Sequence, residues 1–259
     1  MKLIIGCPIY DRAWVLPYWF HFLERQSISL DNIGFVFIAS KEDESTISIL
    51  EAWKELHPEV SVFDIVFPED VNHFSHKDGT RHWTLSKYEN MVRLRNHLLK
   101  QVRLYQPDYF MSLDSDILLT NPNTLELLAL HINEGADAVN PLMYMTPVGD
   151  RFPSVMKWLN EPGQKATRDC EFSLGTYFKS DVIMAAKMMS KKTYNDVDYK
   201  IHDQGEDLGW SAACAEKNFS LYAATYIYAI HVMNKSMLGD ILKNGDPREQ
   251  ITMKTLSKA

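Results

Sequence analysis

Cysteine is scarce in this chain, and its three copies lie far from one another. Cys7, Cys170 and Cys214 are odd in number and widely separated, which excludes the dense disulfide framework of small secreted domains. We therefore expect reduced thiols and a cytoplasmic protein, with peripheral attachment to a membrane as the alternative.

Long apolar runs, internal repeats and an excess of positive charge are also missing. No run approaches the roughly 20 apolar residues of a transmembrane helix, so we expect no integral membrane segment. Lys and Arg number 27 against 34 Asp and Glu, and the net charge of −7 argues against general nucleic-acid binding. A hydrophobic fraction of 46% over 259 residues is enough for the core of one large domain.

One stretch departs from this acidic balance. Between positions 73 and 103 only Asp78 and Glu89 oppose a series of basic side chains. The series could bind a diphosphate, a phosphorylated acceptor or a nucleic-acid backbone, or it could be a solvated helix face with a polar loop. Its members are His73, His76, Lys77, Arg81, His82, Lys87, Arg93, Arg95, His97, Lys100 and Arg103.

Two acidic residues follow an apolar run in the middle of the chain. Residues 109–113 are typical of a buried strand, and Asp114 and Asp116 come where this run ends. In open α/β sheets, ligands bind beyond the carboxyl ends of the strands, and two acids this close are costly to hold without a cation. The pair indicates a site for a metal and an anionic ligand, although an isolated Asp-x-Asp is more often a polar turn.

The first part of the chain alternates between strand and helix patterns. Apolar runs predict buried strands, and apolar residues three or four apart predict helices. Strand, helix, strand, helix, strand in succession indicates a parallel sheet layered by helices. The predicted strands are 2–7, 33–39 and 60–67, and the predicted helices include 15–23 and 49–56.

The rest of the chain continues with two long irregular stretches. A polar loop is expected at 68–86, and the Pro- and Gly-containing segment 146–171 is a candidate lid over a substrate. Further helices are predicted at 87–105, 124–132, 181–190 and from 203 onward. Further strands are predicted at 136–142, 172–178 (with Gly175 inside it) and 221–230, followed by a peripheral tail from 234.

The predicted helix at 87–105 separates two neighbouring arginines. At about 100° per residue, Arg95 lies about 40° from Met91, at the edge of the apolar stripe. Arg93 lies about 160° from Met91 on the same wheel. Arg95 is therefore predicted to reach a site beside the sheet, and Arg93 is predicted to face solvent.

Six segments, in this order, resemble those of the family-two type of glycosyltransferase with the GT-A fold. Each motif is weak alone, and their order over about nine-tenths of the chain carries the resemblance. One departure is Ala39-Ser40-Lys41, where the family often has an acidic residue near the nucleotide. The segments are Cys7-Pro8-Ile9-Tyr10-Asp11-Arg12, Arg93-Leu94-Arg95-Asn96, Asp114-Ser115-Asp116, Gly175-Thr176-Tyr177-Phe178, Gly205-Glu206-Asp207-Leu208-Gly209-Trp210 and His231.

The resemblance implies an α/β fold of the GT-A type. A single domain would have a Rossmann-like, mostly parallel central sheet flanked by helices. The catalytic domain would span 1–232, with a nucleotide-sugar half at about 1–120 and an acceptor half at about 121–232, and a C-terminal tail would follow at 233–259.

The resemblance also implies roles for the motif residues. Asp116 and His231 are the expected ligands of Mn²⁺ or Mg²⁺, whose preferred donors include carboxylate and imidazole groups. Asp114 is expected at the ribose or at a metal-bound water. Asp207 is the expected general base, with Glu206 in its place if the register is one residue off. The donor would lie against Pro8, Tyr10, Asp11, Arg12, Arg95, Asp114 and Ser115.

The function so implied is metal-dependent transfer of a sugar from a UDP- or GDP-sugar to an acceptor hydroxyl, with inversion at the anomeric carbon. A glycan or lipid-linked sugar is the expected acceptor, and a modified base in DNA is the alternative. Alternatives of other classes are a nucleotidyltransferase and a non-catalytic protein that binds nucleotide sugars. A dehalogenase-type phosphatase is disfavoured, because Leu118 stands where that class needs a threonine.

Overall fold

The computed structural model describes residues 2–71, 83–144, 152–168 and 171–245. Within these residues an eight-stranded sheet forms the centre, accompanied by a three-stranded sheet and a two-stranded pair. The main sheet has the order β3 (Phe63–Val66), β2 (Ile33–Ile38), β1 (Leu3–Pro8), β4 (Tyr109–Leu113), β11 (Ala186–Ser190), β6 (Ala138–Leu142), β12 (Leu221–Tyr228) and β9 (Tyr177–Lys179). The three-stranded sheet has the order β10 (Val182–Ile183), β7 (Val155–Trp158) and β8 (Ala166–Thr167), and the pair is β13 (Ile230–His231) with β5 (Ile117–Leu118).

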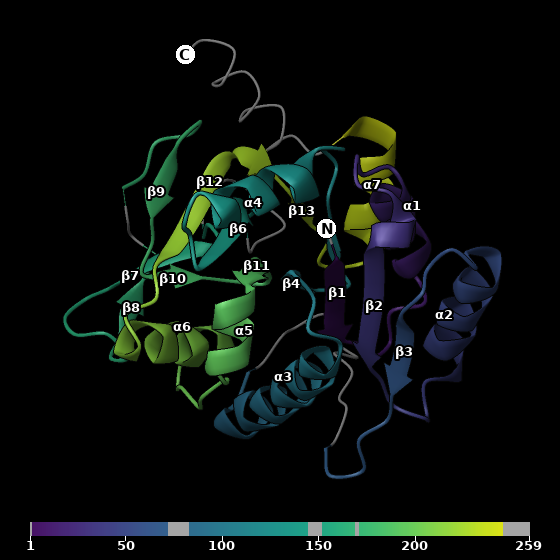
Figure 1. Cartoon of the computed structure of the whole chain (residues 1–259), viewed down its shortest axis with the longest axis horizontal. Coiled ribbons are helices and arrows are strands. Elements are labelled where there is room, and N and C mark those ends of the chain that lie inside the picture. The colour runs from purple at the N-terminus through teal and green to yellow at the C-terminus, as the bar shows by residue number, and fades with distance from the viewer. Residues whose placement is uncertain (1, 72–82, 145–151, 169–170, 246–259) are drawn as a thin grey trace.

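The first half of the main sheet is parallel, as the alternation of strands and helices predicts. β1 pairs in parallel with β2 and with β4, and β2 pairs in parallel with β3. β11 runs antiparallel between β4 and β6, and β9 runs antiparallel to β12. β6 and β12 are again parallel. The sheet is therefore mixed and mostly parallel (Figure 1).

Helices cover both faces of this sheet, which gives three layers (Figure 1). The helices in the described residues are α1 (Leu16–Glu24), α2 (Glu44–Leu56), α3 (Leu85–Tyr105), α4 (Thr124–Asn133), α5 (Lys191–Asp196), α6 (Glu206–Glu216) and α7 (Lys235–Asn244), with a short 3₁₀ turn at Leu30–Asn32. One core cluster joins α1, α2 and α4 to one face; in it Phe20 stacks on Trp53 with ring centres 4.2 Å apart. A second cluster joins α3, α5 and α6 to the other face.

Local sequence sets where several helices begin. Asp43, Thr84 and Asn234 cap α2, α3 and α7, each accepting a backbone N–H of the first turn, as short polar side chains do at helix starts. Pro17 lies in the first turn of α1, where its missing N–H removes no helical hydrogen bond. The predicted early helices and strands are confirmed, with boundaries that differ by a few residues.

Two predicted elements late in the chain are wrong. Residues 181–190, predicted as a helix, form β10 and β11, with Ala185 between them at φ 60°. The predicted strand at 172–178 is much shorter, because β9 begins only at Tyr177 and Gly175 lies before it at φ 78°. Short apolar runs do not distinguish a buried strand from a buried helix by periodicity.

The structure describes only part of the segments to which the remaining predictions apply. The segment 146–171 is not wholly irregular, because β7 and β8 pair within it, whereas 146–151 and 169–170 lie outside the described residues. Residues 72–82 of the predicted loop and 246–259 of the tail also lie outside them. The described part of the tail contains α7, which buries Leu238 in the core. Cys7 and Cys214 are buried free thiols, and Cys170 is not among the described residues.

None of the helices in the described residues is both long enough and apolar enough to span a membrane.

Candidate active site

The loop Asp114-Ser115-Asp116 follows β4 and is held from two sides. Trp19 Nε1 of α1 donates to the backbone carbonyl of Asp114 at 3.2 Å, and the Asp114 backbone N–H donates to the carbonyl of Ala185 at 3.1 Å. Ser115 and Asp116 are buried, and Asp114 is partly exposed. The two carboxylates therefore project from a fixed backbone at the carboxyl end of a parallel strand, where α/β sheets bind ligands.

His231 reaches the same place from the far end of the described chain. β13 pairs with β5 so that His231 lies opposite Ile117, and Val232 N–H donates to the Asp116 carbonyl at 2.8 Å. His231 Nε2 lies 3.6 Å from Asp116 Oδ1. Arg12 Nη2, from the loop after β1, lies 3.5 Å from Asp116 Oδ2. Three segments far apart in sequence thus meet at Asp116.

The donor set at Asp116 and His231 fits a divalent ion. A carboxylate oxygen and an imidazole nitrogen are ligands that suit Mn²⁺, and such an ion fills its other positions with phosphate oxygens or water. His231 is buried, and among the described residues its Nδ1 has no hydrogen-bond partner; Nε2 is the nitrogen that faces Asp116. No group of three or more His, Cys, Asp or Glu side chains that could hold a metal occurs in the described part of the chain.

Arg95 is fully buried and connects the two acidic segments of the site. Its Nη1 donates to Ser112 Oγ at 3.0 Å, and its Nη2 donates to Asp114 Oδ1 at 2.5 Å. The same Nη2 lies 3.8 Å from Glu206 Oε1. Arg93, two residues earlier on α3, is exposed. The helical wheel therefore predicted both arginines correctly.

α6 begins with two adjacent carboxylates in different surroundings. Gly205 has φ 129°, a conformation that favours glycine, and this turn puts Glu206 first in the helix. Burial and the charge of Asp207 raise the pKa of Glu206 to about 7, and Arg95 opposes them only in part. Burial also disfavours the charge on Asp207, but Lys187 and Arg95 outweigh it, so the pKa of Asp207 is lowered.

The loop that contains Pro8, Tyr10, Asp11 and Arg12 is tied to the start of α2. Asp11 N–H donates to Asp43 Oδ2 at 2.5 Å, and Arg12 N–H donates to the Thr46 hydroxyl at 3.0 Å. Arg12 also donates from its guanidinium to the carbonyl oxygens of residues 10 and 11. These bonds fix the loop beside the end of β2.

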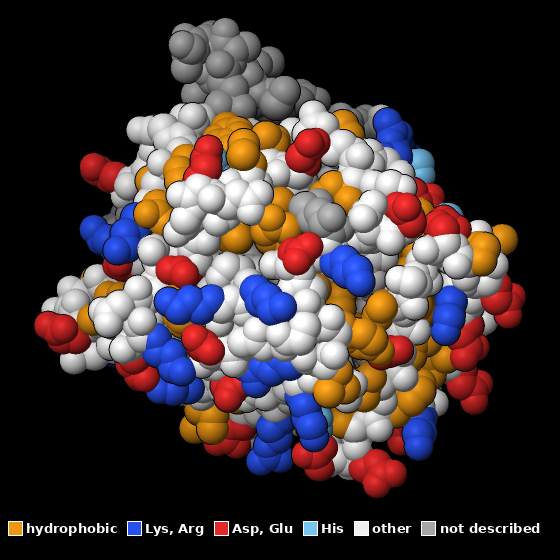
Figure 2. Space-filling view, viewed as in Figure 1, with side chains coloured by type: hydrophobic (Ala, Val, Ile, Leu, Met, Phe, Trp, Pro, Cys, Tyr) orange, Lys and Arg blue, Asp and Glu red, His pale blue; other side chains and the backbone are white. Residues whose placement is uncertain are grey.

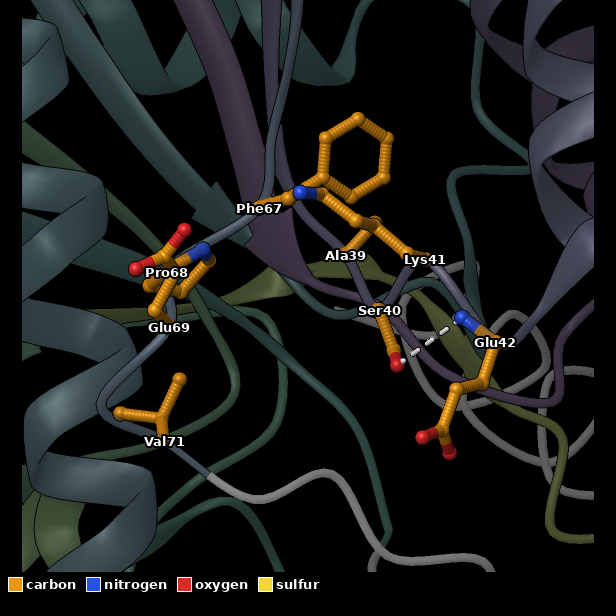
Figure 3. A pocket seen from close by; sticks show the side chains of 8 residues that line it. All are labelled: Ala39, Ser40, Lys41, Glu42, Phe67, Pro68, Glu69 and Val71. Atoms are coloured by element: carbon orange, nitrogen blue, oxygen red, sulfur yellow. Dashed lines mark hydrogen bonds between the residues drawn. The ribbon is translucent and has the colours of Figure 1, made fainter.

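A cavity of about 220 Å³ opens where β2 and β3 end (Figure 3). In its wall Ser40 Oγ accepts the Glu42 backbone N–H at 3.3 Å. Ala39-Ser40-Lys41, the segment that departs from the family-two pattern, forms one side of this cavity. The lining residues are Ala39, Ser40, Lys41, Glu42, Phe67, Pro68, Glu69 and Val71.

The basic series at 73–103 does not form one patch in its described part. Arg95 is buried at the site, His97 pairs with Asp70 at 2.9 Å, and Arg103 pairs with Asp198 at 2.7 Å. On the face drawn in Figure 2, basic and acidic side chains are interspersed. The members outside the described residues are His73, His76, Lys77, Arg81 and His82.

Three residues that shape this site were not predicted from the sequence. Trp19 lies in the helix predicted at 15–23 without a predicted role at the site, and the signal for Asp43 is that an Asp before Glu-Ser-Thr at a helix start favours an N-cap. Lys187 lies in the segment 181–190, whose pattern predicts a helix and gives the lysine no place in the sheet. A single lysine inside the apolar run 182–189 is itself a signal, because a buried charge requires a partner.

The arrangement of sheet and helices is that of the GT-A-type glycosyltransferases. A solved mannosyltransferase from Pyrobaculum calidifontis, in complex with GDP-Man and Mn²⁺, superposes on this chain with a TM-score of 0.60. The match covers 97% of this chain and 60% of that one at 12% identity. A likeness at this identity shows the shared fold, and the predicted fold class is confirmed.

The particular family follows from the sequence itself. Residues 2–155, more than half of the chain, match the profile of the glycosyltransferase family 25 N-terminal domain. The chain belongs to glycosyltransferase family 25. The predicted class of enzyme is therefore confirmed, whereas the finer resemblance to the family-two type is not what this match shows.

Relatives in the same family are much longer than the region they share with this chain. A glycosyltransferase 25 family member from Aedes aegypti is 29% identical over 133 residues, which is 51% of this chain and 22% of that protein. Procollagen galactosyltransferase 1-A from Xenopus laevis is 41% identical over 70 residues, 27% of this chain and 11% of that protein. The chain thus matches about a fifth or less of these relatives' length.

Proposed function

We propose that this chain transfers a sugar from a nucleotide-sugar donor to an acceptor hydroxyl, with Mn²⁺ or Mg²⁺ held by Asp116 and His231. The convergence of these two side chains with Arg12 at the strand ends carries the proposal. A bound divalent ion would stabilise the charge that develops on the diphosphate as the glycosidic bond breaks. Arg12 adds a fixed positive charge at the same place.

The nucleotide of the donor would lie along the loops after β1 and β2. Pro8, Tyr10 and Asp11 would contact it, and the adjacent cavity of about 220 Å³ has room for a nucleobase. Asp114 and Ser115 would face the ribose or a metal-bound water. In this arrangement residues 1–120 bind the donor and residues 121–232 provide the acceptor side.

The acceptor hydroxyl would lose its proton to a carboxylate at the start of α6, where Glu206 and Asp207 are adjacent. General-base catalysis of this kind contributes roughly 10²–10⁴-fold to rate. A single base on the acceptor side supports direct displacement, and therefore inversion at the anomeric carbon. Arg95, which lies between Glu206 and Asp114, would hold this carboxylate pair in place beside the donor site.

The similar proteins guide the choice of substrates to test. A galactosyl donor comes first because the Xenopus relative is a procollagen galactosyltransferase, and a mannosyl donor comes second because the Pyrobaculum structure contains GDP-Man. A hydroxyl of a glycan or lipid-linked sugar is the proposed acceptor. A modified base in DNA is the alternative, and its binding would weaken steeply with salt.

Thermal unfolding with and without donors tests the proposal. UDP-galactose, UDP-GlcNAc and GDP-mannose are each added with Mn²⁺ or with EDTA. A donor at 100 times its Kd stabilises the native state by about 2.7 kcal/mol, which raises Tm by about 5–10 °C in a domain of this size. Asp116→Ala and His231→Ala should lose the Mn²⁺-dependent part of this rise, and His21→Ala, at an exposed histidine, should keep it.

Product analysis with the best donor then separates the reaction classes. Sugar transfer releases a nucleoside diphosphate, whereas nucleotidyl transfer consumes or releases pyrophosphate. Equal turnover in EDTA would remove the metal from the proposal. No stabilisation by any nucleotide sugar would overturn donor binding at this site.

A further inference from the structure

Lys187 is a charged residue in the middle of the main sheet. It belongs to β11, opposite Ser112 of β4, and its side chain is fully buried. Its ammonium lies 5.2 Å from the ring centre of Tyr199 and 5.0 Å from that of Trp210. A lysine in such surroundings is held there by its partners, because desolvation of an ammonium is costly.

The anionic partner of Lys187 is Asp207. Lys187 Nζ donates to Asp207 Oδ1, and the Ala185 backbone N–H donates to Asp207 Oδ2 at 3.0 Å. Both carboxylate oxygens of Asp207 are therefore bound within the protein. Protonation of this carboxylate would remove the negative charge that compensates the buried Lys187 ammonium, which makes Asp207 a poor proton acceptor.

Glu206 is placed differently, although it is the neighbouring residue. Its carboxylate lies 3.8 Å from Arg95 Nη2, the same nitrogen that binds Asp114. It therefore faces the segment that ends in the Asp-x-Asp loop. The charged and titratable groups around it are Arg95 and Tyr88 on α3, Asp114 after β4 and Asp207 on α6.

We propose that Lys187 is a positioning residue that holds Asp207 as a permanent anion, and that Glu206 is the base that accepts the proton of the acceptor hydroxyl. This inference rests on the sugar transfer proposed above. The acceptor oxygen forms a bond to the anomeric carbon as its proton passes to Glu206. The bond from the anomeric carbon to the donor phosphate oxygen breaks, and its electron pair leaves with the nucleoside diphosphate.

The electrostatics of the pair agree with this division of roles. Burial and the Asp207 anion raise the pKa of Glu206 to about 7, which is suited to a base that must accept and release a proton near neutral pH. Asp207 is thereby useful without exchanging a proton, because its fixed charge keeps the proton affinity of Glu206 high. The sequence-based choice of Asp207 as base is thus reversed in this proposal.

A ¹³C NMR titration of the side-chain carboxyl groups tests the assignment without any assay of activity. In the wild-type protein one carboxyl should titrate near neutral pH, and Glu206→Gln should remove that signal. Asp207→Asn should move it towards lower pH, by at least about one unit, because the neighbouring anion is gone. Asp198→Asn, at an exposed aspartate, is the matched control and should leave it unchanged.

Asp207→Asn leaves Lys187 buried without its anionic partner and could prevent folding. The double variant Lys187→Met/Asp207→Asn removes both charges, and replacement of a buried ion pair by uncharged groups is often neutral for stability. We expect the double variant to fold and to show the same displacement of the Glu206 titration. A neutral-pH titration that disappears in the double variant but persists in Glu206→Gln would overturn the proposal.

The pH dependence of sugar transfer supplies the second readout. Glu206→Gln should lower kcat by about 100-fold or more while the donor still raises Tm. The double variant should stay active, with the acidic limb of its pH profile moved to lower pH. Loss of transfer at every pH in the double variant, with activity retained in Glu206→Gln, would assign the base to Asp207. If the wild-type protein transferred no sugar, the proposed function would fail, and the NMR titration would still decide the roles of Lys187 and Asp207.

Discussion

Arg95 shows how one side chain organises the site at the residue scale. Its guanidinium is fully buried and contacts Ser112, Asp114 and Glu206, which come from the sheet, the Asp-x-Asp loop and α6. The planar guanidinium can donate in several directions at once, which an ammonium cannot do with the same geometry. Its loss would leave Asp114 and Glu206 without a compensating charge between them.

We expect Arg95→Met to destabilise the protein by about 3 kcal/mol, because removing one partner of a buried ion pair leaves the other charge uncompensated. The free energy of unfolding from urea titration at pH 7 measures this loss. Arg93→Met on the exposed side of the same helix is the matched control and should change stability by less than about 0.5 kcal/mol. Equal effects of the two substitutions would show that the burial of Arg95 has no energetic consequence.

At this scale the sequence predicts where a single side chain lies better than it predicts which residue that side chain pairs with. The wheel of α3 separated Arg95 from Arg93 because helix geometry is local and regular. The partnership of Lys187 with Asp207 could not be derived in this way, because it depends on β11 lying beside β4 and on α6 packing against the sheet. Which of two adjacent acids holds a proton is decided by such long-range contacts.

At the scale of elements, α6 lies unusually close to the segment before it. Gly209 is in the second turn of this helix, and a Cβ there would overlap the backbone carbonyl of Lys200. That carbonyl cannot swing aside as a flexible side chain could. The glycine therefore allows the close approach that fixes the start of α6, and with it Glu206, beside the sheet.

Gly209→Ala should destabilise the protein by about 1–3 kcal/mol, because added volume at a tight backbone contact forces the helix to shift. Gly239→Ala in α7 is the matched control: nothing lies within 4 Å of its added Cβ, and alanine should stabilise the helix by up to about 1 kcal/mol. Chemical denaturation of the two variants measures the contrast. A Gly209→Ala protein at least as stable as wild type would refute the close-packing account of α6.

The wrongly predicted helix at 181–190 has a physical cause. Residues 181–190 contain alanine, methionine and lysine, which favour helices locally. In the structure residues 186–190 become a central strand because neighbours on both edges, β4 and β6, satisfy their backbone groups, and residues 182–183 pair with β7 in the three-stranded sheet. Such tertiary pairing overrides weak local preference. The early strands were predicted correctly because their β-branched and aromatic composition agrees with their final environment.

At the scale of the whole molecule, the two predicted halves are joined through shared strands. β11, from the acceptor half, is inserted between β4 of the nucleotide half and β6. β13 pairs with β5 across the same division, and this pairing brings His231 to Asp116. The boundary near residue 120 is therefore a division of proposed roles, and strand pairing continues across it.

We expect this continuity to make unfolding a single cooperative transition. Calorimetric and van't Hoff enthalpies should agree, and tryptophan fluorescence and far-UV circular dichroism should report the same midpoint. A fragment of residues 1–120 should fail to fold alone, because β4 would lose its β11 edge and β5 its only pairing partner in the described residues. Mixing it with residues 121–259 should restore structure if the shared strands are the cause. Two resolved transitions in the intact chain, or an isolated 1–120 fragment that melts cooperatively, would show that the halves are independent units and that the meeting of His231 with Asp116 depends on how they dock.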